Sequence, residues 1–234
     1  MGAEVLAGRD VVLFDYDGTL ANTVGPILAC FEQTLAQWGF SPEEMGDLRR
    51  MVGPPLPYSF CDVYGMSCEE AEDITRVYRA NFAQIGLDEF PLFEGVPQLL
   101  DDLLAAGRRL AVATSRLEER TLVMLGHQGI LDRFEVVMGQ LPEGRAAKAE
   151  VINDVLDALA CDRSRVVMVG DRSFDVEGAA AFGLPCVGVT YADTGGVDEL
   201  RQAGAAAIAP SVSDLGRILL GAGDTAADVW VEGD

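Results

Sequence analysis

Two aspartates follow a short apolar run near the start of the sequence. In the segment F-D-Y-D-G-T-L, residues 14–20, the apolar run ends at Asp15, and Asp17 lies two residues further on. Alternate side chains of an extended chain share one side, so both carboxylates should face the same way. Adjacent carboxylates repel each other unless a cation joins them, and a divalent cation with oxygen ligands is the natural partner. The segment predicts a metal-dependent site at a strand end, with Gly18 turning the backbone beside the ligand.

A second pair of aspartates follows another apolar run. Asp171 comes directly after residues 166–170, and Asp175 lies one helical turn later. In a doubly wound sheet, ligands bind at the carboxyl ends of the strands, where such residues come together. Mg²⁺ binds through one or two carboxylates together with water and substrate phosphate. Together with Asp15, this pair predicts a magnesium site.

Two further segments offer groups for the same edge of the sheet. The chain has sixteen arginines but a single lysine, Lys148, at the start of a helical pattern. Arginine is a wide planar fork, whereas lysine is a compact charge on a flexible stem, so a site needing one small cation beside phosphate and carboxylate would tolerate only lysine. Thr114 and Ser115 end another apolar run and would add hydroxyl and backbone donors there.

The elements that must position these residues alternate between short apolar runs and helical patterns, which is typical of βαβ units around a parallel sheet. The spacing of apolar residues predicts a helix over 151–159, and another over 97–106 that leads into the second strand. The predicted fold class is therefore α/β, with a doubly wound parallel sheet. Its predicted strands are residues 11–15, 110–114, 135–138, 166–170, 186–189 and 206–209.

The link between the first two predicted strands, residues 16–109, is far longer than a normal crossover. Apolar residues at helical spacing and two capping boxes, at 41–44 and 67–70, predict that the inserted segment is helical. We therefore expect an α/β core formed by residues 1–22 and 91–220, with a small helical cap of residues 23–90. The acidic, glycine-rich residues 221–234 are expected to form a flexible tail.

Composition limits the function further. The 234 residues include 17 basic and 38 acidic side chains, a formal charge of −21. Such a surface repels nucleic-acid phosphates and anionic lipid, so neither is an expected partner. The five cysteines contain no C-x-x-C pair, which predicts reduced thiols and a cytoplasmic location. The sequence contains no run of about 18 apolar residues that would predict a membrane span, and it does not indicate an oligomeric state.

Taken in chain order, these motifs resemble those of the haloacid dehalogenase superfamily of phosphatases. The matching features are D-x-D-G-T-L at 15–20, Thr114, Lys148 and G-D-x-x-x-D at 170–175. The resemblance covers almost the whole chain, with residues 23–90 similar to the helical cap of that superfamily. It implies hydrolysis of a small phosphorylated metabolite through an aspartyl-phosphate intermediate, with Mg²⁺ as cofactor. Asn22 stands where many members have Asp, a departure that bears on the subgroup rather than the chemistry.

The resemblance also implies roles for individual residues. Asp15 would be the nucleophile, Asp17 the general acid/base, and Lys148 the bridge between nucleophile and phosphate. The implied metal site consists of Asp15, Asp17, Asp171 and Asp175. The implied phosphate-binding residues are Gly18, Thr19, Thr114, Ser115 and Lys148.

Selectivity would come from the cap. Residues 52–56, V-G-P-P-L, resemble the cap loop of phosphoglycolate phosphatase-like members. Arg49 and Arg50, just ahead of this loop, would then meet a substrate carboxylate, and Gly53 in the loop is a predicted substrate-binding residue. Alternatively, Tyr58 and Phe60 would stack on a base, which would favour a nucleoside 5′-monophosphate. We expect the phosphoglycolate phosphatase-like activity, with a 5′-nucleotidase as the alternative.

Other activities of similar folds need different residues. The complete acidic set argues against a dehalogenase, and a cap without lysine argues against a phosphonatase that uses a cap lysine as a Schiff base. A sugar phosphomutase shares the core carboxylates and stays open. A non-catalytic binding protein or phospho-acceptor domain is disfavoured because every catalytic position is filled.

Overall fold

The structure is a computed structural model that describes residues 6–52, 54, 56–142, 144–145, 147–192, 194–221 and 230–231. The chain divides into two compact units. One, here called the core unit, consists of Met1–Asn22 and Leu92–Asp234, and the other, the cap unit, of Thr23–Pro91. Within the described residues, no helix is long and apolar enough to cross a membrane.

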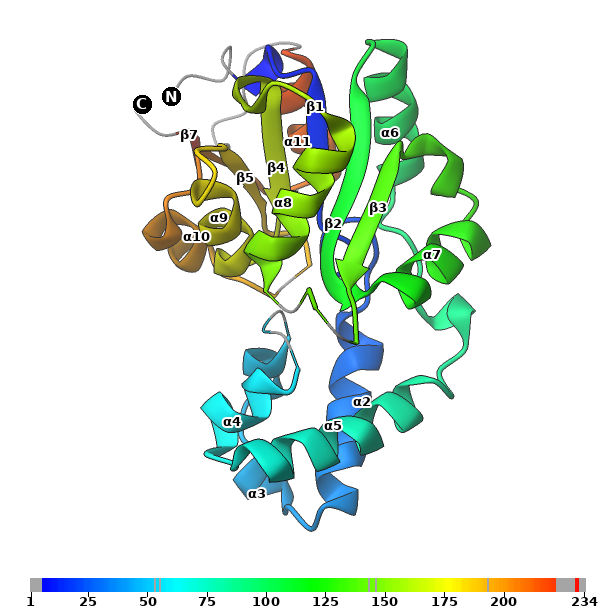
Figure 1. Cartoon of the computed structure of the whole chain (residues 1–234), viewed down its shortest axis with the longest axis vertical. Coiled ribbons are helices and arrows are strands. Elements are labelled where there is room, and N and C mark those ends of the chain that lie inside the picture. Colours follow the sequence, from blue (N-terminus) through cyan, green and yellow to red (C-terminus); the bar gives the residue numbers. More distant parts are fainter. Residues whose placement is uncertain are drawn as a thin grey trace. The chain divides into compact units, whose positions relative to one another are not determined.

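The core unit is built on a seven-stranded sheet in the order β3-β2-β1-β4-β5-β6-β7 (Figure 1). The first six strands are parallel, and β7 pairs antiparallel with β6. The central strands are apolar and buried along their whole length, as expected where helices cover both faces of a parallel sheet. The predicted doubly wound α/β fold is confirmed. The strands are β1 (Val11–Phe14), β2 (Arg109–Leu117), β3 (Val136–Gln140), β4 (Val166–Gly170), β5 (Cys186–Val189), β6 (Ala207–Ala209) and β7 (Trp230–Val231).

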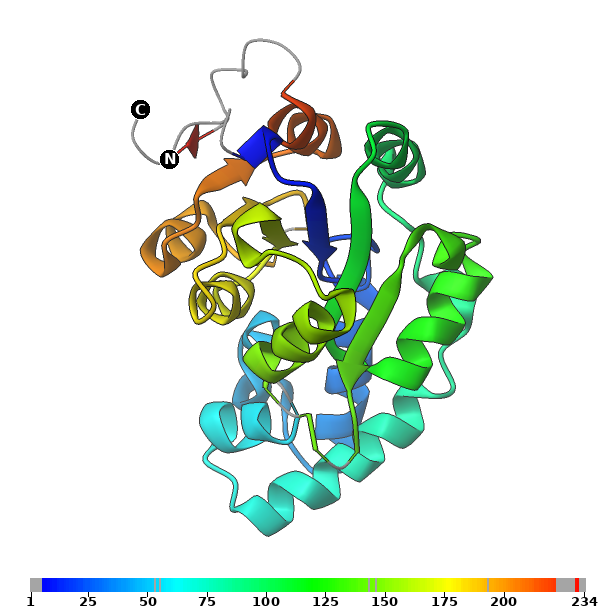
Figure 2. The same ribbon diagram turned by 45° about the horizontal axis from the view of Figure 1, so that its top comes forward.

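Helices cover both faces of this sheet (Figure 2). On one face, α8 (Lys148–Leu159) and α9 (Ser173–Ala180) bury their apolar sides against β1, β2 and β4. On the other, α6 (Val96–Ala105) and α11 (Val212–Leu220) pack against each other. Lys148 is the first residue of α8, and Asp175 lies in the first turn of α9, as predicted. The core unit also contains α7 (Glu118–His127), α10 (Val197–Ala203), η3 (Leu131–Arg133) and η4 (Arg163–Arg165).

The cap unit is helical. Both predicted capping boxes are confirmed: Ser41 pairs with Glu44 at the start of α3, and Ser67 pairs with Glu70 at the start of α5. The interior is aromatic, with the Phe31 ring stacked on the Tyr78 ring at a centroid distance of 4.4 Å. The cap elements are α2 (Val24–Gln37), α3 (Pro42–Met45), η1 (Leu48–Met51), α4 (Tyr58–Tyr64), α5 (Cys68–Phe82) and η2 (Leu87–Glu89).

Apart from shifts of a few residues at the ends of several elements, two details differ from the sequence prediction. The second strand was expected to end at Thr114, but β2 continues to Leu117, and its register with β3 shifts between Ala113 and Leu117. Residues 230 and 231 lie in the segment expected to be a flexible tail, yet they pair with β6. The rest of 222–234 lies outside the described residues.

Candidate active site

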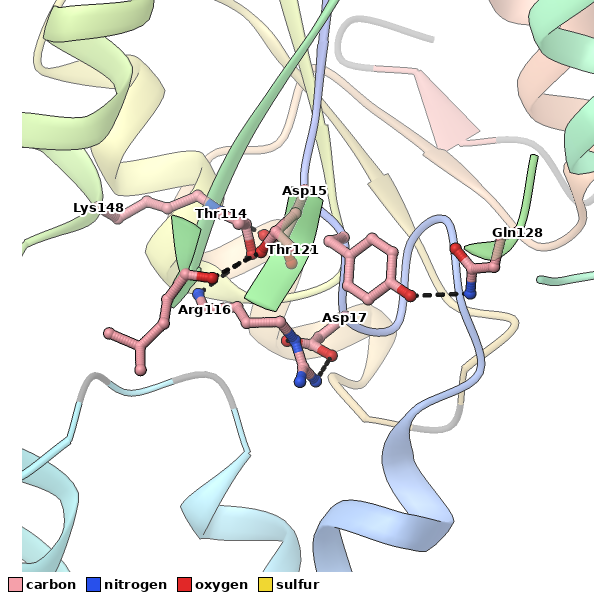
Figure 3. A network of polar contacts seen from close by, with 9 residues as sticks. Asp15, Asp17, Thr114, Arg116, Thr121, Gln128 and Lys148 are labelled. Carbon is pink, nitrogen blue, oxygen red and sulfur yellow. Dashed lines mark hydrogen bonds and ion pairs between the residues drawn. The ribbon is translucent and has the colours of Figure 1, made fainter. Parts of the chain in front are cut away.

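Four charged side chains meet at the carboxyl ends of β1 and β4 and the first turns of α8 and α9. Asp15 is the residue after β1, and Lys148 Nζ lies 2.6 Å from its Oδ1 (Figure 3). The same Nζ lies 2.7 Å from Asp175 Oδ1. Asp171 follows β4 and is buried beside them. The structure therefore brings together Asp15, Lys148 and the second pair of aspartates, Asp171 and Asp175, that the sequence indicated.

The carboxylates of Asp15, Asp171 and Asp175 form a site that could hold a metal ion. One oxygen from each lies within 4.8 Å of the others, and all three residues are buried. Gly18, with φ of 72°, is required here, because a Cβ at that position would lie 2.2 Å from Asp171 Oδ2. Three carboxylate oxygens at this spacing fit a hard divalent cation such as Mg²⁺.

The electrostatics of the cluster also favour a cation. Burial raises the pKa of Asp15 to about 6, although Lys148 opposes the shift. Burial also raises the pKa of Asp171, and the neighbouring Asp175 and Asp15 add to that shift. Burial alone would lower the pKa of Lys148, but the two aspartates outweigh it and keep the lysine charged. Because one ammonium does not offset three buried carboxylates, a bound divalent cation would complete the charge balance.

The carboxylate of Asp17, which was also predicted to ligate the metal, lies outside the cluster of three carboxylates. Arg116 binds both oxygens of its carboxylate, with Nε 2.9 Å from Oδ2 and Nη2 in contact with Oδ1 (Figure 3). The side chain of Asp17 is therefore engaged by a guanidinium and is absent from the three-carboxylate cluster in the described residues. Its position two residues after Asp15 still suits a group that exchanges protons with a bound substrate.

The predicted phosphate-binding residues fall into two groups. Thr114 is buried in β2, where its Oγ1 accepts a hydrogen bond from the backbone N–H of Arg116 at 3.3 Å, and Ser115 is half-buried beside it. The backbone N–H groups of Gly18 and Thr19 instead donate within the turn, to the carbonyl oxygens of residues 21 and 16. Neither is a spare donor for phosphate. The Thr19 hydroxyl is buried and has no hydrogen-bond partner among the described residues, so it is a side-chain group of this turn that could bind a ligand.

The loop after β5 contributes residues that the sequence analysis missed. Thr194 Oγ1 donates a hydrogen bond to Asp171 Oδ2, and Tyr191 Oη donates to the backbone oxygen of Thr19 at 2.8 Å. The loop thus orients Asp171, one of the three clustered carboxylates, and anchors the turn that follows Asp17. Nothing local in the sequence marks these residues, because their contacts depend on how β5 lies beside β4.

The predicted cap residues meet different surroundings. Arg49 and Arg50 are exposed in η1, and the Arg50 Nε donates to the backbone oxygen of Asp47 at 3.0 Å. Gly53 lies outside the described residues. Tyr58 is 56 % exposed, but Phe60 is fully buried, with its ring packed edge-on against another phenylalanine. The expectation that Phe60 stacks on a nucleotide base is therefore wrong, because its ring belongs to the interior of the cap.

The sequence has relatives of known class. Residues 12–189 match the family described as haloacid dehalogenase-like hydrolase. The chain is 39 % identical to the tyrosine-protein kinase PtkA of Mycobacterium tuberculosis, over 82 % of this chain and 72 % of the relative. It is 34 % identical to a 5′-nucleotidase of Pseudomonas aeruginosa, over 81 % and 86 % of the two chains, and 32 % identical to a phosphoglycolate phosphatase of Caulobacter vibrioides, over 78 % and 80 %.

A solved structure supports the same assignment. The crystal structure of a predicted phosphatase from Clostridium acetobutylicum superposes with a TM-score of 0.86 and 33 % identity, covering 91 % of this chain and 99 % of that one. The chain belongs to the haloacid dehalogenase-like hydrolase family. Within that family it is a phosphatase.

The hydrogen bond from Thr194 to Asp171 leads to a first prediction. Replacing Thr194 with valine keeps the shape of the side chain but removes the donor, so Asp171 is held less firmly. Residues that orient metal ligands typically contribute about 10- to 100-fold to metal affinity. We expect T194V to weaken Mg²⁺ binding by roughly tenfold in a calorimetric titration. T121V is the control, because the Thr121 hydroxyl donates its hydrogen bond to the backbone oxygen of Leu117 rather than to a carboxylate. Equal affinities in the two variants would contradict this role.

The raised pKa of Asp15 leads to a second prediction. A carboxyl group with a pKa near 6 carries a proton below that pH, and the proton must leave before a cation can bind. Mg²⁺ affinity should therefore increase as pH rises through 6, and because the pKa of Asp171 is raised as well, the affinity should not fall again at higher pH. Below pH 6 the expected slope is about tenfold per pH unit for each displaced proton. Calorimetric titrations from pH 5 to pH 8 would measure this slope, and an affinity that does not change with pH would contradict the prediction.

Proposed function

We propose that this protein is a Mg²⁺-dependent phosphomonoester hydrolase that acts through an aspartyl-phosphate on Asp15. The observation that carries the proposal is the buried contact of Lys148 with both Asp15 and Asp175, beside the three-carboxylate site. Asp15, Asp171 and Asp175 would hold the metal. When bound, Mg²⁺ would offset the negative charge of the phosphoryl oxygens and of these carboxylates.

The protein side chains would divide the remaining work. The phosphoryl group would lie with its phosphorus in line with Asp15 Oδ, and Lys148 and Thr114 would bind its oxygens. Asp15 attacks phosphorus while Asp17 gives a proton to the leaving oxygen. A water molecule then attacks the aspartyl-phosphate, and Asp17 takes the proton from that water. The cycle ends with Asp15 and Asp17 in their starting states.

For the substrate, we propose a small phosphorylated metabolite of the phosphoglycolate type. The two exposed cap arginines support it, since guanidinium groups bind carboxylates well. The exposed Tyr58 and the identity to a 5′-nucleotidase support the alternative, a nucleoside 5′-monophosphate. A sugar phosphomutase would use the same core carboxylates. We further propose a cytoplasmic location, because the five cysteines are free thiols.

The test is release of inorganic phosphate from 2-phosphoglycolate, nucleoside 5′-monophosphates, sugar phosphates, phosphotyrosine and ATP. Each substrate is assayed with Mg²⁺ and with EDTA. ATP is included, with a tyrosine-containing peptide as acceptor, because one relative is a tyrosine-protein kinase. Mg²⁺-dependent hydrolysis of at least one monoester is the expected result.

Each outcome of this panel has a distinct meaning. The highest kcat/KM selects between the carboxylate and the nucleotide substrates. Interconversion of sugar phosphates without phosphate release would support the mutase, and labelling of the peptide by ATP would support a phosphotransferase. No turnover of any monoester with Mg²⁺ would contradict the proposed function.

A further inference from the structure

Arg116 is a residue of the site to which the proposed mechanism gives no role. Its side chain is only 7 % exposed, and it binds Asp17 with the planar fork of the guanidinium against both carboxylate oxygens. Its Cζ also lies 5.5 Å from the centroid of the Tyr16 ring, within the range of a cation–π contact. A buried, two-point ion pair of this kind fixes the direction of a carboxylate as well as its distance.

The backbone that carries Arg116 is itself held in place. Its N–H donates to Thr114 Oγ1 at 3.3 Å. On the adjacent strand, a Cβ at Gly139 would lie 2.3 Å from the Arg116 carbonyl oxygen, so the two strands approach closely only because residue 139 is glycine. Tyr16, whose ring faces the guanidinium, is fully buried, and its Oη accepts a hydrogen bond from Gln128 at 2.8 Å (Figure 3). The backbone and the side chain of Arg116 are thus both held in place where its guanidinium binds Asp17.

We propose that Arg116 is a positioning residue that aims the carboxyl group of Asp17 at the leaving oxygen of the substrate. The inference rests on the proposed function, since it assigns Asp17 the role of general acid and base. Nε holds Oδ2 at 2.9 Å. A protonated carboxyl group still accepts a hydrogen bond at its carbonyl oxygen, so this bond persists when Oδ1 carries a proton. When substrate is bound, Asp17 Oδ1 gives up its contact with Arg116 Nη2 and contacts the leaving oxygen instead.

The two chemical steps define where Arg116 acts. In the first, the Asp15–phosphorus bond forms and the bond from phosphorus to the leaving oxygen breaks, while the proton on Asp17 moves to that oxygen and gives an alcohol. In the second, water attacks phosphorus, the Asp15–phosphorus bond breaks, and a water proton returns to Asp17. The sum is a phosphomonoester plus water giving an alcohol plus inorganic phosphate.

The experiment uses leaving groups that differ in their need for a proton. An alkyl phosphate loses an alkoxide, which needs the acid, whereas p-nitrophenyl phosphate loses a stable phenolate, which does not. The measured quantity is kcat/KM, because it reports the steps up to loss of the leaving group and is insensitive to hydrolysis of the intermediate. The alkyl substrate is the alkyl monoester with the highest kcat/KM in the phosphate-release assays. It and p-nitrophenyl phosphate are each assayed with wild type, R116M and R116K in Mg²⁺.

General acid catalysis contributes roughly 10²- to 10⁴-fold, so partial misplacement of Asp17 should cost about 10- to 100-fold. We expect R116M to lower kcat/KM for the alkyl phosphate by that factor and to leave kcat/KM for p-nitrophenyl phosphate within about threefold of wild type. R116K keeps the charge but not the fork, and it should recover only part of the loss. KM for both substrates should stay close to wild type.

R108M is the matched control. Arg108 directly precedes β2, the strand of Arg116, and like Arg116 it is largely buried and paired with an aspartate, in this case Asp10. R108M should change thermal stability without a difference between the substrates. Equal losses of kcat/KM with both substrates in R116M and R116K, or no loss with either, would overturn the inference. If wild type turns over neither substrate with Mg²⁺, the proposed function fails first. If R116M does not fold, the comparison is made with R116K, for which the same leaving-group difference is expected.

Discussion

Replacing Asp15 with asparagine should lower kcat for every substrate of this protein by about 10⁴-fold or more, since loss of a covalent nucleophile has effects of this size in other hydrolases. The amide is a poor nucleophile, and it also removes a negative ligand from the three-carboxylate site and the anionic partner of Lys148. Steady-state kinetics with Mg²⁺ would measure the loss. Rapid quenching should also show a phosphorylated protein in wild type and none in D15N.

The matched control for D15N is D10N. Asp10 lies just before the same strand, at its amino end, and pairs with Arg108 and Arg165. Its substitution alters an ion-pair network of the core unit far along β1 from the reacting atoms, so turnover should stay within about threefold of wild type. D15N retaining more than about 1 % of wild-type kcat would contradict covalent catalysis by Asp15.

The sequence was sufficient for features that depend on local patterns. The hydrophobic runs at 166–170 and 186–189 are strands with these bounds, since a fully buried parallel strand must be apolar throughout. Likewise, Asp15, Lys148 and Asp171 come together because each follows a strand or begins a helix at the same edge of the sheet. Their convergence follows from the topology alone.

The pairing of Arg116 with Asp17 could not be predicted in the same way. It needs β2 to continue past Thr114, with the shift of register against β3 that ends at Leu117. That geometry is set by contact between two strands rather than by any local preference. Phe60 could not be placed from the sequence for a different reason. An aromatic residue near a loop suits either a binding surface or a core. In the structure Phe60 packs against another phenylalanine ring of the cap and is fully buried.

The second large effect is expected at Lys148. Its side chain is 6 % exposed and its ammonium lies between Asp15 and Asp175, so K148M leaves these carboxylates without their cation. Removing one partner of a buried ion pair costs about 3–5 kcal/mol of unfolding free energy. Because uncompensated carboxyl groups bind protons more tightly in the folded state, this destabilisation should be small at pH 5 and grow as pH rises to 8. Mg²⁺ should recover part of it. Urea unfolding across this pH range, with Mg²⁺ and with EDTA, would measure both trends.

K148R separates the charge of Lys148 from its shape. The stem is closely packed, since a Cβ at Gly178 would lie 3.2 Å from Lys148 Cγ, and a guanidinium is wider than an ammonium. Arginine should therefore restore much of the stability lost in K148M. However, kcat should stay at least about 10²-fold below wild type, because the wide guanidinium cannot contact Asp15 and a phosphoryl oxygen from the position of the ammonium. If K148R had wild-type kcat, the cluster would need only a positive charge. Catalysis would then not explain why this position is lysine in a chain whose other sixteen basic residues are arginine.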